Sequence, residues 1–254
     1  MARKLILAAA AALVLGGSGA IALAATVIPA NIAAAVTDTK RPADETARDA
    51  DRKPAEMLAF AGVKPGDAVV DLIPGKGYFT RLFSVAVGPK GKVYAFLPAE
   101  FAKFAKTPLP ANGAPWNPAW PNVTFLTAPA NSFATPEPVD VVWTSQNYHD
   151  LHDDFAKPAE VAVINRAVFN ALKPGGVFII LDHVAADGSG LSATNTLHRI
   201  DPAAVKSEVE AAGFKYEGET TILRNPADPH TAIVFDPSIR GKTDQFVFKF
   251  RKPK

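Results

Sequence analysis

The stretch "AVVDLIPGKGYFT", residues 68–80, decides how the chain folds. A β-branched apolar run ends at Asp71, two glycines follow at Gly75 and Gly77, and an apolar helix-like stretch comes next. This order predicts a buried strand, a tight turn and a helix, because glycine permits the left-handed backbone that such turns use. A third glycine would complete a ligand-binding loop, but the sequence has Ile73 there, followed by a proline that has no N–H to donate.

Apolar runs and helical stretches alternate along the rest of the chain. The predicted strands cover residues 68–73, 92–97, 123–128, 139–145, 176–183, 215–223 and 245–252. The predicted helices cover residues 51–62, 78–87, 99–106, 158–172 and 202–212. The pattern predicts a doubly wound, Rossmann-like α/β sheet of about seven strands, mostly parallel, with an antiparallel pair at the C-terminal edge. Residues 107–122 are too rich in Pro, Asn and Gly for a helix and predict a long loop.

The N-terminus has the pattern of a secretory signal peptide. Arg3 and Lys4 precede a short apolar run, and residues 22–24 offer a small-x-small cleavage site. The sequence therefore predicts a signal peptide (1–24), a flexible leader (25–50), one domain (51–254), and a periplasmic or secreted protein without stable membrane insertion. An uncleaved membrane anchor is the alternative, because residues 5–37 carry no charge.

Charge and cysteine content exclude several classes of function. Removal of Arg3 and Lys4 leaves 25 basic residues, which equals the 25 acidic residues. A net charge near zero gives no electrostatic reason to expect nucleic acid as a partner. The chain has no cysteine, which excludes disulfides, thiolate metal ligands and cysteine nucleophiles.

Several motifs resemble those of one enzyme family. Over residues 53–252 the chain resembles class I S-adenosylmethionine-dependent methyltransferases, through "DLIPGKGYFTR", "VDVVWTSQNYHDL", "ALKPGGVFIILDH" and "VEAAGF". More narrowly, it is similar to the exported predicted methyltransferases of bacteria at residues 71–81, 148–152, 197–201 and 246–253. This resemblance implies S-adenosylmethionine as cofactor and methyl transfer to a small molecule.

The resemblance also implies where the cofactor binds. In such sheets, ligands lie beyond the carboxyl ends of the strands where the strand order reverses. The candidate cofactor-binding residues are Asp71, Gly75, Gly77, Tyr78, Gln146 and Asn147. However, Leu97 occupies the position of the family's ribose-binding acid, with Glu100 three residues further on, and only Asn131 and Ser132 stand near the adenine position. The unmatched ribose hydroxyls predict a weakened cofactor site.

The polar stretch "SQNYHDLHDD", residues 145–154, follows the fourth predicted strand. One interpretation makes His149 a general base, with Tyr148 and His152 as further catalytic candidates. A second interpretation is a divalent metal site formed by His149, His152 and His183 with an aspartate. In the third, Asp150 caps a helix and the imidazoles only pack or form local hydrogen bonds. The sequence leaves all three open.

The motif "LHRID" is equally ambiguous, because Arg199 and Asp201 can pair with each other or contact substrate. The leading hypothesis is an exported methyltransferase that acts on an unknown small molecule. The alternatives are a periplasmic binding or structural protein on the same fold that has lost the chemistry, and a histidine-based, metal-dependent enzyme.

Overall fold

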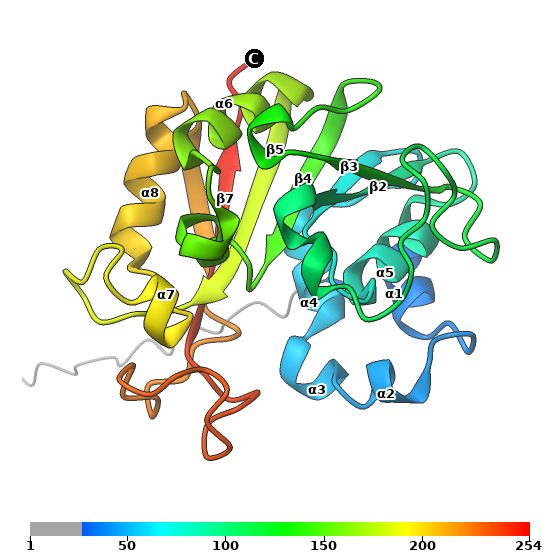
Figure 1. The fold of residues 1–254 in the computed structure, drawn as a ribbon. Helices are drawn as coiled ribbons and strands as arrows, with labels where there is room; N and C mark the ends of the chain where they lie inside the picture. The colour runs from blue at the N-terminus through cyan, green and yellow to red at the C-terminus, as the bar shows by residue number, and fades with distance from the viewer. Residues whose placement is uncertain (1–26) are drawn as a thin grey trace, which may run out of the picture.

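The computed structural model describes residues 27–254, so the predicted signal peptide lies outside the described residues. Its centre is a seven-stranded sheet with strand order β3-β2-β1-β4-β5-β7-β6 (Figure 1). The strands are β1 (Ala68–Leu72), β2 (Lys92–Pro98), β3 (Val123–Ala128), β4 (Val139–Ser145), β5 (Leu172–His183), β6 (Lys215–Thr220) and β7 (Gln245–Arg251). Strands β1 to β5 pair in parallel, while β7 pairs antiparallel with β5 and β6. The predicted fold class is confirmed.

Helices cover both faces of the sheet (Figure 1). The α-helices are α1 (Ala30–Val36), α2 (Ala43–Thr46), α3 (Asp49–Arg52), α4 (Pro54–Ala61), α5 (Tyr78–Val87), α6 (Val161–Ala171), α7 (Thr194–Leu197) and α8 (Pro202–Ala211). Four short 3-10 turns are η1 (Ala99–Phe104), η2 (Ala130–Ser132), η3 (His149–His152) and η4 (Asp154–Ala156). Helices α1, α4 and α5 pack on one face, and α6 and α8 pack on the other.

The strand, turn and helix at residues 68–87 form as the sequence predicts. All five residues of β1 are buried, because helices cover it on both sides. Gly77 adopts a left-handed φ of 86° directly before the first residue of α5, and Gly88 directly follows its last residue. This segment sets the centre of the sheet, since β1 pairs with both β2 and β4.

The prediction of a flexible leader at residues 25–50 is wrong for the helical part of that segment. Helix α1 packs on α4 and α5, and its Ile32 and Ala35 are fully buried. The side chain of Asn31 donates to the carbonyls of Val63 and Ala86, at 3.2 and 3.0 Å. The alanine-rich composition hid this helix, because small side chains give little hydrophobic signal yet let a helix approach its neighbours closely.

The two segments between β2 and β3 lie where the sequence predicts them, but the first is a shorter helix than expected. The predicted helix at 99–106 is the shorter 3-10 turn η1, and the predicted loop at 107–122 contains no helix or strand. Within residues 27–254, no helix combines the length and apolar character required to cross a membrane.

Candidate functional site

The carboxyl edge of the parallel strands is where the functional side chains gather. Strands β1 and β4 are neighbours, and the order of the sheet reverses between them. In Figure 1, α2, α3, α7 and the long connection between β6 and β7 lie at this edge. Ligands of open α/β sheets bind at such a reversal point.

The glycine loop after β1 keeps its shape although one glycine is missing. Ile73 has a φ of 58°, and Gly75 and Gly77 have φ values of 58° and 86°. The left-handed conformation costs a non-glycine residue about 1–2 kcal/mol. It is held by a bond from the Ile73 N–H to the Phe96 carbonyl (2.8 Å) and one from the Asn147 amide to the Ile73 carbonyl (3.0 Å). Ile73 thus adopts the backbone of the absent glycine.

A second strained residue lies at the end of the neighbouring strand. Gln146 directly follows β4 and has a φ of 61°. Its side-chain amide donates to Gln245 at 3.0 Å. Strained backbone persists where the surrounding structure enforces it, often at binding sites. Ile73 and Gln146 place two such positions on either side of the reversal point.

Asp71, a predicted cofactor residue, is 3% exposed at the end of β1. Its carboxylate accepts a 2.6 Å hydrogen bond from the Thr80 hydroxyl. Burial raises the pKa of Asp71 to about 7, although Thr80 and the nearby Arg52 favour the charged form. The carboxyl group therefore titrates near neutral pH.

Arg52, at the end of α3, is the functional candidate that sequence reasoning missed. Its guanidinium lies over the Tyr78 ring at 4.6 Å, and its Nη2 donates to the Gln146 side chain at 3.1 Å. Burial lowers its pKa to about 10, so it stays charged at neutral pH. The Nε of Arg52 is buried and has no hydrogen-bond partner within residues 27–254. In the same part of the chain, no carboxylate forms a salt bridge with the Arg52 guanidinium. A half-paired guanidinium beside the glycine loop is suited to bind an anion. The packing of α3 places the Arg52 side chain beside the glycine loop, and no sequence motif predicts this position.

Two other predicted cofactor residues are engaged within the protein. The Tyr78 hydroxyl donates to Asp49 at 2.6 Å, and Asp49 also binds Arg41. Asn147 donates to the carbonyls of Ile73 and Ser145 and so ties the ends of β1 and β4 together. Both residues lie at the site and support its walls.

The candidates for ribose and adenine binding also have partners of their own. The Glu100 carboxylate accepts from the Ala130 N–H at 3.1 Å. The Asn131 side chain donates to the Pro158 carbonyl and accepts from the Glu160 N–H. Their hydrogen-bonding capacity is thus partly used in holding the turns after β2 and β3.

The tryptophans of the 107–122 loop contact the glycine loop. A β-carbon added to Gly77 would lie 3.5 Å from the Trp116 ring and 3.7 Å from the Trp120 ring. The Arg81 guanidinium lies 4.1 Å from the centre of the Trp120 ring. The loop therefore packs against the start of α5, and its tryptophans leave little room for a side chain at position 77.

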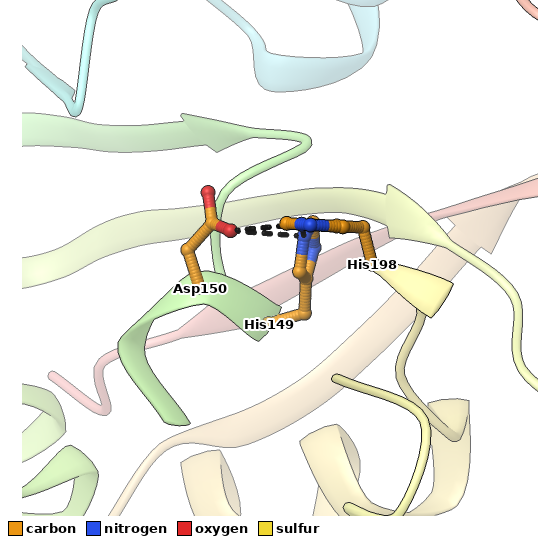
Figure 2. A group of neighbouring side chains, drawn as sticks. All are labelled: His149, Asp150 and His198. Atoms are coloured by element: carbon orange, nitrogen blue, oxygen red, sulfur yellow. Dashed lines mark hydrogen bonds and ion pairs between the residues drawn. The ribbon is translucent and has the colours of Figure 1, made fainter. Parts of the chain in front are cut away.

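His149 is the centre of a buried polar group at the ends of β4 and β5. Its Nδ1 lies 2.8 Å from Asp182 Oδ1, and its Nε2 lies 3.1 Å from Asp150 Oδ1 and 3.3 Å from His198 Nδ1 (Figure 2). Burial opposes its charge, but the two carboxylates outweigh burial and raise the pKa of His149 to about 10. Both carboxylates favour the charged imidazole, so a proton must leave Nε2 before this atom can act as the predicted general base or bind a metal ion.

Tyr148 and His152, the other predicted catalytic residues, belong to a separate group. The Tyr148 hydroxyl is fully buried, donates to Glu208 at 2.9 Å and accepts from the Asn165 side chain at 2.8 Å. His152 Nε2 also lies next to Glu208, at 3.2 Å. These contacts fasten the η3 turn to α6 and α8.

The predicted metal set of His149, His152 and His183 is incorrect. His183 Nδ1 lies 2.7 Å from the Thr243 hydroxyl, burial lowers the pKa of His183 to about 4, and its ring is 6.2 Å from that of His149. Within residues 27–254, the side chains that converge are instead those of His149, Asp150 and His198. His149 and His152 share the η3 turn but bind different carboxylates, those of Asp182 and Glu208.

Two open hollows of about 510 and 520 Å³ lie at the opposite edge of the sheet, and both include Lys90 and Lys92. Lys92 begins β2 and Ala68 begins β1, so these hollows are at the amino ends of the strands. They contain none of the candidate site residues described above, and ligands of such sheets bind at the carboxyl ends of the strands instead.

In sequence, part of the chain is similar to known methyltransferases. No family model matches the chain. The ubiquinone/menaquinone biosynthesis C-methyltransferase UbiE of Pseudomonas paraeruginosa is 30% identical over 138 residues, which are 53% of this chain and 49% of that protein. UbiE of Pseudomonas aeruginosa strain LESB58 is 30% identical over 128 residues, or 49% of this chain and 45% of that protein. The chain thus spans about half the length of the curated relatives it matches.

Solved structures match over most of the chain. A SAM-dependent methyltransferase from Aquifex aeolicus aligns with a TM-score of 0.51 and 18% identity, covering 78% of this chain and 88% of its own. The 1,6-didemethyltoxoflavin-N1-methyltransferase of Burkholderia thailandensis, solved with S-adenosylhomocysteine, has a TM-score of 0.51 and 19% identity over 83% of this chain and 80% of its own. The [4+2]-cyclase SpnF has a TM-score of 0.52 and 17% identity, covering 80% of this chain and 81% of its own. The chain therefore has the class I fold of S-adenosylmethionine-dependent methyltransferases.

Proposed function

We propose that the protein transfers a methyl group from S-adenosylmethionine to a small molecule. The observation that carries this proposal is Arg52, a charged and incompletely paired guanidinium at the wall of the glycine loop. The amino-acid part of the cofactor ends in a carboxylate, which is the kind of anion that a guanidinium binds best. Its amino group would lie towards the Asp71 carboxylate, and the open backbone at Gly75 would allow close approach.

The cofactor's ribose has less support, which makes the proposed binding weak. Leu97 has no polar atom in its side chain, and Glu100 already accepts a hydrogen bond from the backbone of Ala130. Each polar group that loses its partner on binding costs about 1–3 kcal/mol. The cofactor supplies the methyl group and the sulfonium chemistry, while this chain's residues bind and orient it.

The test is calorimetric titration of the purified chain with S-adenosylhomocysteine, which has the same carboxylate, amine and nucleoside. We expect saturable heat. 5′-Methylthioadenosine, which lacks the amino-acid part, is the matched probe and should bind much more weakly because Arg52 and Asp71 have nothing to hold. If neither compound produces heat, the proposal fails and the fold is a scaffold without its cofactor.

Asp71 makes this binding depend on pH. The ligand's ammonium group favours the ionised carboxylate, and the pKa of Asp71 in the folded protein is about 7. Affinity should therefore rise with pH, by about tenfold between pH 6 and pH 8, as the ionised fraction of Asp71 grows. Titrations across this range measure it, and Asp71→Asn should remove the dependence. A wild-type affinity that stays constant from pH 6 to pH 8 would contradict this role.

We further propose that the protein acts outside the cytoplasm, on the basis of the signal-like sequence at residues 1–24. The mature chain should then begin near Ala25. Intact-mass measurement of protein recovered from the expressing cells decides the point. Full-length chain in the membrane fraction would instead support an uncleaved anchor.

A further inference from the structure

Three side-chain atoms, two on the η3 turn and one directly after α7, form a nearly equilateral triangle (Figure 2). Its corners are His149 Nε2, Asp150 Oδ1 and His198 Nδ1, and its sides measure 3.1, 3.3 and 3.4 Å. A tetrahedral zinc ion with bonds of about 2.0–2.1 Å keeps its ligand atoms about 3.3–3.4 Å apart. The three atoms thus have the spacing of one face of such a site.

Hydrogen bonds account for two sides of this triangle, because Asp150 Oδ1 can accept from His149 Nε2 and from His198 Nδ1. The third side then places two N–H donors 3.3 Å apart, a contact that brings no attraction of its own. A cation near the centre of the triangle contacts all three atoms at once. We propose that His149, Asp150 and His198 bind a divalent transition-metal ion of the Zn²⁺ type. Two nitrogen ligands disfavour Mg²⁺ and Ca²⁺, which prefer oxygen.

The residues behind the triangle are arranged as a support for its ligands. Asp182 is fully buried, and its carboxylate accepts from His149 Nδ1 and from the N–H groups of His149 and His183, each at 2.8 Å. A carboxylate on the second ring nitrogen fixes the orientation of a metal-binding imidazole and leaves Nε2 for the ion. His198 is held at a left-handed φ of 53°, a strained conformation for a non-glycine residue.

The proposed site is open on one side. The side chains of Asp150 and His198 are 17% and 26% exposed, whereas that of His149 is 3% exposed. Three protein ligands with an accessible fourth position are typical of catalytic zinc sites, in which water or substrate completes the coordination. An acceptor hydroxyl could bind there, a role that rests on the proposed methyl transfer, whereas metal binding itself does not.

The experiment measures metal binding on the full chain without any methyl acceptor. Chelator-treated protein is titrated with Zn²⁺ by calorimetry and, in parallel, with Co²⁺, whose visible spectrum reports coordination geometry. We expect about one ion per chain and a four-coordinate Co²⁺ spectrum. His198→Ala removes a partly exposed ligand and should weaken binding at least a hundredfold. Asp182→Asn should weaken it about 10- to 100-fold, because it disturbs the imidazole orientation only.

His152→Ala is the matched control, because His152 lies on the same turn but contacts Glu208. This variant should bind Zn²⁺ within about twofold of wild type. Thermal melts of every variant without metal show whether each is folded. The proposal is overturned if folded wild-type protein takes up no ion, or if folded His198→Ala binds as tightly as wild type. S-adenosylhomocysteine binding is measured separately, so loss of one activity does not imply loss of the other.

Discussion

Replacing Arg199 with alanine should lower the free energy of unfolding by about 3–5 kcal/mol, because it leaves the buried carboxylate of Asp228 without its charged partner. Arg199 and Asp228 are both fully buried and form two parallel hydrogen bonds of 2.9 and 3.0 Å. The same guanidinium donates to the carbonyls of Val184 and Ala232. It thereby joins the end of β5 to the connection between β6 and β7. Denaturant unfolding measures the loss.

Arg251→Ala is the matched control for that experiment. Arg251 also binds a carboxylate with two nitrogens, that of Glu217, but its side chain is 41% exposed. An exposed ion pair contributes only about 0–1 kcal/mol, since water replaces the lost partner. Similar losses in the two variants would show that burial is not what makes the Arg199 pair important.

Replacing Arg52 with alanine should weaken S-adenosylhomocysteine binding by about 1.5–3 kcal/mol, or roughly 10- to 150-fold, the range for hydrogen bonds to charged groups. The reason is the loss of a guanidinium that lies over the Tyr78 ring beside the glycine loop and has an unpaired Nε. Calorimetric titration gives the ratio. Thermal melts show whether the variant stays folded, because the change also removes the stacking of Arg52 on Tyr78 and its hydrogen bond to Gln146.

Arg48→Ala removes the same charge from the neighbourhood of α3 and serves as the control. Arg48 is exposed and directly precedes α3, so its loss changes the local field without changing a contact at the loop. Its effect on affinity should be less than about threefold at physiological salt, where exposed charges are screened. Equal effects of the two substitutions would assign Arg52 a general electrostatic role and refute direct carboxylate binding.

The fold could be predicted from the sequence wherever burial is complete. The bounds of β3 and β4 agree with prediction to the residue, because turn-forming residues bracket each apolar run. Helix α1 could not be found in this way, since its buried residues are Ile32 and Ala35. The hydrophobic pattern of a segment indicates how much apolar surface it can bury, and the small side chains of α1 provide little.

The site could be predicted only where topology brings the residues together. Asp71 lies at the end of β1 and Gln146 directly follows the adjacent parallel strand β4, so their proximity follows from the strand order alone. The partner of Arg199 could not be found, because Asp201 instead accepts from the N–H groups of Ala203 and Gly188, and Asp228 comes from a distant loop. Contacts that depend on irregular connections leave no periodic signal in the sequence.

The borders of the sheet limit its tendency to aggregate. On one side, the 107–122 segment covers β3, with Pro115 bridging to Thr124 and the Gly113 N–H bonded to the Phe125 carbonyl. On the other, β6 exposes every second residue and is interrupted by a bulge between Tyr216 and Gly218. Unprotected strand edges invite strands from other molecules, and bulges or covering loops prevent this. The two edges of the sheet are thus protected in different ways, and each hinders backbone pairing with strands of other molecules.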